Sequence, residues 1–370
     1  MIKRKDKVFS EEYSGMVVAA FSEKKSMNSL QKFSPEFNEL SAAENISLEK
    51  AIRSAEKFVE NSLKISEVNY ATRDAHSKTY ATVKAKLEVS ENLPDFIAKI
   101  FDKESYELLL RFSNANLVIN KKGREIPAYG FSLKIKNIGQ NEANFPMVNF
   151  PLFPTNSPSV FLKFFTSVNT FLVTKQDNFL VSALDLPHLL KNGLSLLSSM
   201  FSGDLMKSTF KLMAHAKDFF FSFKFYGIGC YRLGDYIMKL SLEPENISPK
   251  IGRGELQKET VNWFLASHES SFNLMIEMCQ NLQDQPINNL KKEWKKAPKF
   301  CLGKIKIPKA AFLNSDDLAI ENLNFDPFKN PEILQPVGKI QQIRKKVYEA
   351  SIRTRNALNQ KKNAGITANI

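Results

Sequence analysis

Residues 80–89 read YATVKAKLEV and alternate between apolar and polar side chains at nearly every position. An alternation with a period of two places the two kinds of side chain on opposite faces of an extended strand. The segments 107–118, 130–138 and 235–243 repeat this pattern and predict further strands. Because strands begin early, recur at close spacing and resume after a helical insert, the sequence predicts an antiparallel sheet or barrel within an α+β fold.

Helices are predicted on both sides of these strands. Ser41 and Glu44 have the spacing of a capping box, and apolar residues recur at helical intervals over 45–65. The other predicted elements are two or three helices in 159–225 with breaks at Gly193 and Gly203, a helix over 255–283, a strand over 304–312 and a proline-bearing loop over 324–338 that leads to a helix containing Arg344.

The chain of 370 residues is expected to form one domain with two appendages. Residues 1–40 are polar and charged without a sustained period, which predicts a partly disordered N-terminal arm. The strands and helices fall within 41–356, and one large barrel with attached helices absorbs that length. Residues 357–370 predict a frayed C-terminal tail.

The net charge of +13 is compatible with binding to nucleic acid or to an anionic membrane surface. The basic residues are scattered along the chain, however, and no nucleic-acid motif accompanies them. A solvated basic surface is therefore favoured, nucleic acid is not expected, and an anionic membrane surface and a homo-oligomer stay open.

Cysteine usage and hydropathy bear on the cellular compartment in which the protein is expected. The three cysteines lack a C-x-x-C spacing, which argues against a disulfide framework or a zinc site. The first residues are basic without an apolar stretch behind them, so no secretory signal is expected, and no apolar run is long enough for a transmembrane segment. A cytoplasmic protein is the default expectation.

One stripe near the C-terminus suggests metal chemistry. On a helix, Arg344, Tyr348, Ser351 and Arg355 lie at i, i+4, i+7 and i+11, so guanidinium groups flank a phenol on both sides. Adjacent positive charge and a metal ion both favour ionisation of a phenol whose unperturbed pKa is about 10. Taken alone, a tyrosine on a basic helix is more often a surface residue, so this pattern needs support from elsewhere.

Such support comes from three upstream motifs, RDAHSK at 73–78, RFSN at 111–114 and VNFPLF at 148–153. In this order and at these intervals, with YRLGDYIMKLSLEP at 231–244, they resemble the haem catalase superfamily, especially its short branch of catalase-related peroxidases and allene oxide synthase-like enzymes. The resemblance covers roughly residues 55–358, in patches. It implies a catalase-like antiparallel β-barrel with surrounding helices over 41–356 and haem b (iron protoporphyrin IX) as cofactor.

The resemblance also implies catalytic roles. Tyr348 would be the proximal iron ligand, as tyrosinate is in catalase. His76 would be the distal base that takes a proton from bound peroxide and returns it to the leaving oxygen. Ser113 would orient the His76 imidazole through its second nitrogen.

Six further residues are implied to bind the cofactor. Arg73 and Arg111 would pair with the haem propionates, for which the guanidinium fork is well suited. Arg344 or Arg355 would hold the phenolate of Tyr348. The remaining two, Phe153 and Phe161, would pack on the porphyrin.

Three positions depart from the family pattern. The distal asparagine of the family falls on Val148, with Asn149 one residue late, so a local shift of one residue is needed for Asn149 to take that catalytic role. Tyr129 stands where the family commonly has an arginine. Ala75 stands where the allene oxide synthase branch typically has a threonine before the distal histidine.

The resulting hypothesis is a haem-dependent, catalase-like peroxidase that cleaves the O–O bond of hydrogen peroxide or an organic hydroperoxide. An alternative is an allene oxide synthase-like enzyme that converts fatty-acid hydroperoxides, whose apolar tail the insert at 159–225 would house. An alternative of another class is a non-enzymatic basic binding protein in which the histidine and the tyrosine are structural.

Overall fold

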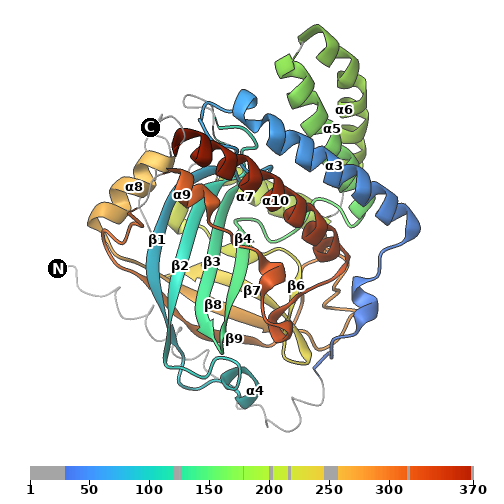
Figure 1. Ribbon diagram of the computed structural model, residues 1–370. Helices are drawn as coiled ribbons and strands as arrows, with labels where there is room; N and C mark the ends of the chain where they lie inside the picture. Colours follow the sequence, from blue (N-terminus) through green and yellow to red (C-terminus); the bar gives the residue numbers. More distant parts are fainter. Residues whose placement is uncertain are drawn as a thin grey trace, which may run out of the picture.

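Figure 1 shows the fold in a computed structural model, which describes residues 30–119, 125, 127–177, 179–199, 203–215, 218–245, 257–314 and 317–367. Of the predicted N-terminal arm, residues 1–29 lie outside the described residues. The rest of the arm packs against the body: Leu30 is buried, Lys32 forms a β-bridge with Tyr236, and a 3-10 turn, η1, covers Pro35–Asn38.

Eight of the described strands close into an antiparallel barrel, in agreement with the α+β prediction. Their order around the barrel is β7-β5-β4-β3-β2-β1-β9-β8, and pairing of β7 with β8 closes the ring, so no barrel strand is left with a free edge. Two short strands, β6 and β10, extend from β7. The strands are β1 Lys78–Val89, β2 Ser105–Asn114, β3 Tyr129–Ile138, β4 Asn141–Val148, β5 Phe225–Gly227, β6 Cys230–Leu233, β7 Tyr236–Pro244, β8 Ser270–Met278, β9 Lys299–Ile307 and β10 Pro336–Val337.

Alternation along the strands fills the barrel with apolar side chains. Phe112 and Phe131 meet inside it with ring centroids 4.9 Å apart, and Phe220, Phe221 and Phe272 pack around them. Much of the phenylalanine content therefore serves core packing. Because the interior is filled, polar side chains of β2, β3 and β4 that can take part in chemistry lie on the outer face of the barrel.

Helices cover that outer face (Figure 1). The long helices α3 (Ala42–Ile65) and α10 (Lys339–Thr367) pack on each other, and α3 also packs on the hairpin of α5 (Pro158–Asp177) and α6 (Phe179–Ser199). The capping box of Ser41 and Glu44 is present at the start of α3, as predicted. The shorter helices are α4 Asp95–Ala98, α7 Gly203–Ala214, α8 Gln257–Ser267, α9 Asp317–Asn322 and the 3-10 turns η2 Phe220–Ser222, η3 Pro327–Lys329 and η4 Glu332–Leu334.

Some predicted elements are wrong. The helix expected over 255–283 ends at Ser267, and β8 follows, because residues 270–278 alternate and find pairing partners in β7 and β9. The last long strand, expected over 304–312, is β9 and begins and ends earlier. Gly193 lies inside α6 and does not break it.

The C-terminal tail is also more regular than predicted. The helix α10 continues to Thr367, and Asn359 within it is buried and exchanges hydrogen bonds with the backbone of Ala71. This tertiary contact stabilises a segment whose sequence alone predicts fraying. None of the helices in the described part of the chain is both long and apolar enough to cross a membrane.

Gly303 allows β9 to approach β1 closely. It lies opposite Val89 where β9 meets β1, and a Cβ atom added to it would stand 2.1 Å from the carbonyl oxygen of Glu88. Because that oxygen belongs to the backbone, Gly303→Ala should lower the free energy of unfolding by roughly 1–3 kcal/mol. Denaturant titration measures the change. Gly203→Ala is the matched control, since a Cβ there meets nothing within 4 Å. Equal stability of the two variants would contradict this account.

Candidate functional site

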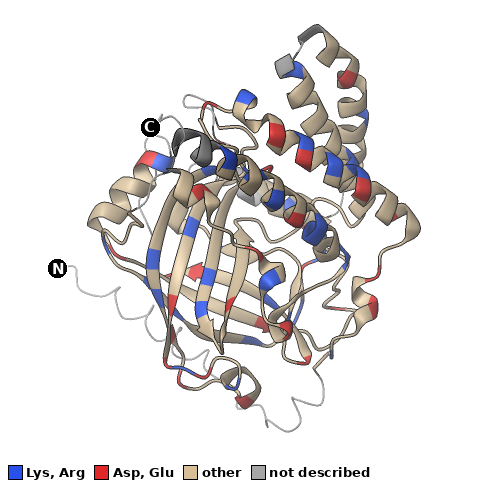
Figure 2. Cartoon of the chain, viewed as in Figure 1, with Lys and Arg blue, Asp and Glu red and all other residues tan. Residues whose placement is uncertain are grey.

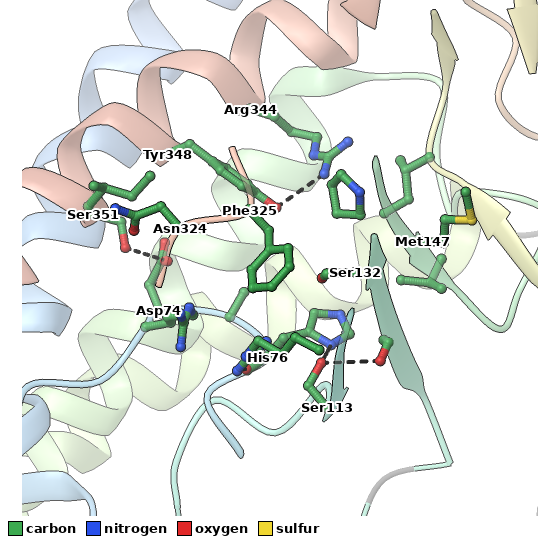
Figure 3. Close-up of a pocket in the computed structure, with 18 of the residues that line it drawn as sticks. Asp74, His76, Ser113, Ser132, Met147, Asn324, Phe325, Arg344, Tyr348 and Ser351 are labelled. Carbon is green, nitrogen blue, oxygen red and sulfur yellow. Dashed lines mark hydrogen bonds between the residues drawn. The ribbon is translucent and has the colours of Figure 1, made fainter. Parts of the chain in front are cut away.

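A cavity lies between the outer face of β2–β4, the loop before β1 and the helix α10 (Figure 3). Its lining comes from distant parts of the chain, because the loop and α10 belong to opposite ends of the sequence. The lining residues are Arg73, Asp74, Ala75, His76, Arg111, Ser113, Gly130, Ser132, Pro146, Met147, Val148, Ile228, Asn324, Phe325, Arg344, Tyr348, Ser351, Ile352 and Arg355.

His76 stands at the cavity wall in an unusual backbone conformation. Its φ of +51° lies in the left-handed region, which residues other than glycine adopt rarely and often at functional sites. Arg111 holds this backbone, since its Nη2 donates a hydrogen bond of 2.7 Å to the carbonyl oxygen of His76. Gly130 leaves the space for the ring, because a Cβ there would lie 2.7 Å from His76 Nδ1 and 2.6 Å from Ser113 Oγ.

Ser113 orients the imidazole. Its Oγ lies 3.4 Å from His76 Nδ1 and 3.4 Å from the carbonyl oxygen of Gly130 (Figure 3). If the hydroxyl donates to that carbonyl, its oxygen accepts a hydrogen bond from Nδ1–H, and the lone pair of His76 Nε2 stays free as a base. The contact is compatible with the orienting role that the family resemblance implies for Ser113, and that role stays a prediction.

The electrostatic surroundings keep His76 neutral. Burial, followed by the positive charges of Arg111, Arg344 and Arg73, lowers the pKa of His76 to about 3. At neutral pH the imidazole is therefore a proton acceptor and carries no charge.

Tyr348 lines the same cavity from α10. The Nη2 atom of Arg344 lies 3.2 Å from its phenol oxygen, and the guanidinium carbon lies 5.4 Å from the ring centroid. Burial alone lowers the pKa of Arg344, but interaction with Tyr348 and Tyr231 outweighs burial and holds the pKa above its ordinary value. Arg344 is thus the partner of the phenol oxygen, whereas Arg355, which also lines the cavity, donates its hydrogen bond to Asn324.

Arg73, Arg111 and Arg355 form a cluster of positive charge beside the cavity. Arg73 is ion-paired with Glu321 on α9, and Arg355 donates a hydrogen bond to Asn324. Burial, and then repulsion from Arg73, lowers the pKa of both Arg111 and Arg355 to about 9. The Nε atom of Arg355 is buried and has no hydrogen-bond acceptor among the described residues.

Two carboxyl groups oppose this charge in part. Glu321 is 1% exposed and contacts Arg73, while Asp74 accepts a hydrogen bond of 2.8 Å from Ser351. Burial raises the pKa of Asp74 despite that bond. Together with Arg344, four guanidinium groups line the cavity, and among the described residues only the carboxyl groups of Asp74 and Glu321 lie close enough to oppose them. This excess of positive charge favours an anionic ligand.

The rest of the wall is apolar and comes from both sides of the site. Val148 contributes from β4, Ile228 from the turn between β5 and β6, and Ile352 from α10, whereas the side chain of Met147 packs in the barrel core. In the view of Figure 3 the ring of Phe325 lies between Tyr348 and His76. A ligand that is both apolar and anionic matches this combination.

Three predicted site residues are not brought to the cavity. The side-chain oxygen of Asn149 accepts a hydrogen bond of 2.8 Å from the backbone of Tyr129, and its nitrogen donates to Pro127. Val148 lines the cavity in its place, because successive residues of an extended chain point to opposite sides and the one-residue shift does not occur. Phe153 and Phe161 contact each other outside the cavity, with ring centroids 4.7 Å apart.

Other cavity residues carried no predicted role. Asn324 and Phe325 come from the irregular segment after α9, and only tertiary contacts place them, as they place Glu321 of α9 against Arg73 beside the cavity. Asp74 lies two residues before His76 in a recognised motif, whereas Gly130 reaches the site because it pairs with Ser113 across β2 and β3. The three cysteines are free, and none lines the cavity.

No protein-family model matches this chain, and no curated protein matches its sequence. Its fold is similar to solved structures of a fungal catalase (15% identity, TM-score 0.55, covering 77% of this chain and 59% of that one), catalase A from Saccharomyces cerevisiae (13%, 0.55, 78% and 62%) and a bacterial catalase (13%, 0.57, 78% and 58%). The chain thus covers less than two thirds of each of these proteins. At this identity the likeness concerns the fold alone, and the barrel with its surrounding helices is a catalase-like fold.

Proposed function

We propose that this protein is a haem-dependent, catalase-like peroxidase that cleaves the O–O bond of hydrogen peroxide or an organic hydroperoxide. One observation carries the proposal: a single cavity holds the Arg344-paired phenol of Tyr348 and the Ser113-oriented, neutral imidazole of His76. A ligand for ferric iron and a proton acceptor are the two groups that such a reaction needs from the protein.

The residues present fit haem b. Tyr348 would hold the iron, and the cationic cluster with the unpartnered Nε of Arg355 would attract the carboxylates of the cofactor. Val148, Ile228 and Phe325 supply apolar surface for a flat ring. Arg111 already donates to His76 and Thr79 and would mainly hold the loop that bears His76. Arg73 is engaged by Glu321 and Leu323, so Arg355 is the better placed to serve a carboxylate.

When bound, ferric haem supplies the redox-active centre at which the O–O bond breaks. The protein supplies the proton transfer. With haem bound, His76 Nε2 would accept the proton from one peroxide oxygen and return it to the other, which would leave as water or as an alcohol, the two electrons for cleavage coming from the haem. Ser113 would keep Nδ1 engaged during this transfer, and Arg344 would donate a hydrogen bond to the phenol oxygen of Tyr348.

Substrate size is the second question. Val148 gives the distal side an apolar wall where an asparagine would help to hold peroxide, and this favours organic hydroperoxides over hydrogen peroxide. An allene oxide synthase-like reaction on fatty-acid hydroperoxides uses the same cavity. Ala75 at the wall, where that branch typically has a threonine, favours the peroxidase.

The absorption spectrum tests the proposal directly. Protein expressed with ample haem should be brown with a Soret band, and Tyr348→Phe should lose haem or lose the high-spin tyrosinate spectrum, because the phenyl ring offers no ligand oxygen. Tyr106→Phe is the control, since that hydroxyl bonds Asp102 away from the cavity. A colourless wild type would favour a non-enzymatic binding protein, and an unchanged spectrum of Tyr348→Phe at full occupancy would mean that another residue binds the iron.

His76→Ala should keep haem and reduce turnover by about 10² or more, the usual loss for a general acid-base group. Because the pKa of His76 is about 3, the base is lost only as pH falls towards that value, so wild-type turnover should show no ionisation of His76 between pH 5 and 8. A pH-rate profile per haem measures this. His188→Ala, on the exposed part of α6, is the control. Retained turnover in His76→Ala would refute the assignment.

The apolar wall at Val148 predicts the preferred reaction. Oxygen release from hydrogen peroxide should be weak, and consumption of an organic hydroperoxide with a reducing donor should be faster per haem. Val148→Asn should shift the ratio towards oxygen release, because it adds a polar group to the wall. Fast oxygen release by the wild type, with negligible consumption of organic hydroperoxide, would show that another group supplies this function.

A further inference from the structure

The helix α6 presents apolar side chains to its surroundings. The large hydrophobic side chains that are exposed in the described chain number thirteen, and six of them belong to this one helix: Val181, Leu184, Leu186, Leu190, Leu194 and Leu197. The exposed fraction reaches 73% for Leu184 and 65% for Leu194. Scattered exposed leucines need no explanation, but six on one helix form a surface.

The distribution of polar and apolar side chains in the α5–α6 hairpin is the reverse of that in a hairpin exposed to water. Asn192 of α6 donates a hydrogen bond of 2.7 Å to Ser167 of α5, and Asn169 and Ser182 are buried. A polar pair thus joins the two helices, whereas six large apolar side chains of α6 are exposed. A water-exposed helix pair normally buries its apolar stripe and exposes its polar one.

Four of these leucines form one stripe along α6. At 3.6 residues per turn, Leu186, Leu190, Leu194 and Leu197 fall within an arc of roughly 80° of the circumference. Leu184 stands apart from this arc, and the exposed Lys191 lies between the two on the circumference. An apolar stripe with a lysine beside it is typical of a helix that lies in a membrane interface, where the leucines enter the acyl layer and the amine reaches the headgroups.

Charge favours an anionic medium. Figure 2 shows few charged residues along the hairpin; its exposed lysines are Lys163, Lys175 and Lys191, and its acidic residues are Asp177 and Asp185. The whole chain carries a net charge of +13, which attracts it to a negative surface. Lysine stems lie along apolar groups while their amines reach phosphate oxygens.

We propose that α6 binds the surface of an anionic lipid bilayer, lying in the interface with its leucine face among the acyl chains. None of the described helices is suited to cross the membrane, which agrees with an interfacial position. The association is independent of the haem proposal, because no residue of the cavity takes part. It would set the catalase-like barrel at a bilayer, where lipid hydroperoxides are found.

Vesicle co-sedimentation of the full chain tests the proposal. The wild type should sediment with vesicles of phosphatidylcholine mixed with phosphatidylserine, bind phosphatidylcholine alone more weakly, and release as salt rises. The double variant Leu190→Glu, Leu194→Glu should bind vesicles at least about tenfold more weakly, because two leucines that would enter the acyl layer are lost. Both positions point outwards, so circular dichroism should stay unchanged. Leu282→Glu with Ile333→Glu, at exposed positions elsewhere, is the matched control.

Fluorescence supplies a second measurement. Leu194→Trp should show blue-shifted emission with the mixed vesicles and quenching by brominated acyl chains, because the indole enters the apolar layer. The proposal is overturned if the wild type does not bind mixed vesicles at low salt, or if the double glutamate variant binds as well as the wild type. It is also overturned if sedimentation velocity shows a dimer that this variant dissociates while vesicles are not bound, which would identify a second copy as the occupant.

Discussion

The filled interior of the barrel is the constraint on which the rest of the structure depends. Aromatic rings such as Phe112, Phe131 and Phe272 pack against each other inside it and leave the cavity no place there. The strands therefore carry two functions on two faces, since residues that alternate with the core side chains point outwards. Arg111 and Ser113 flank Phe112 and reach the cavity for this reason alone. A site on the outside of a barrel needs a cover, and α10 provides it.

Electrostatics connects the two sides of the cavity. Burial, and then the positive charge of the guanidinium groups, lowers the pKa of His76, and the same positive charge is available to an anionic ligand and to the phenol of Tyr348. Glu321 compensates for part of this positive charge through its ion pair with Arg73. The ion pair lowers the electrostatic cost of burying the guanidinium groups when no ligand is bound. One distribution of charge thus sets the protonation of the base and the kind of ligand accepted.

Local pattern predicts much of this structure, and non-local pairing accounts for the errors. The alternation at 80–89 was sufficient to predict β1, and the helical spacing of Arg344 and Tyr348 placed both on one side of α10. Residues 270–278 alternate as well, but their partner strands β7 and β9 lie elsewhere in the sequence. The helix predicted over 255–283 therefore wrongly included these residues. The position of Asn149 depended on a shift of one residue, which decides the side of the chain on which a residue points. Asn324 and Phe325 reach the cavity on an irregular segment after α9, for which the sequence offers no period.

The bond between Asn359 and Ala71 spans 288 positions of the chain. It anchors the final turns of α10 to the loop that presents His76, and Ser351 makes a second connection to the same loop through Asp74. During synthesis that loop emerges from the ribosome long before either partner does. The cavity therefore has only one of its walls until α10 has been released from the ribosome. A nascent chain that lacks this helix cannot enclose a ligand between His76 and Tyr348.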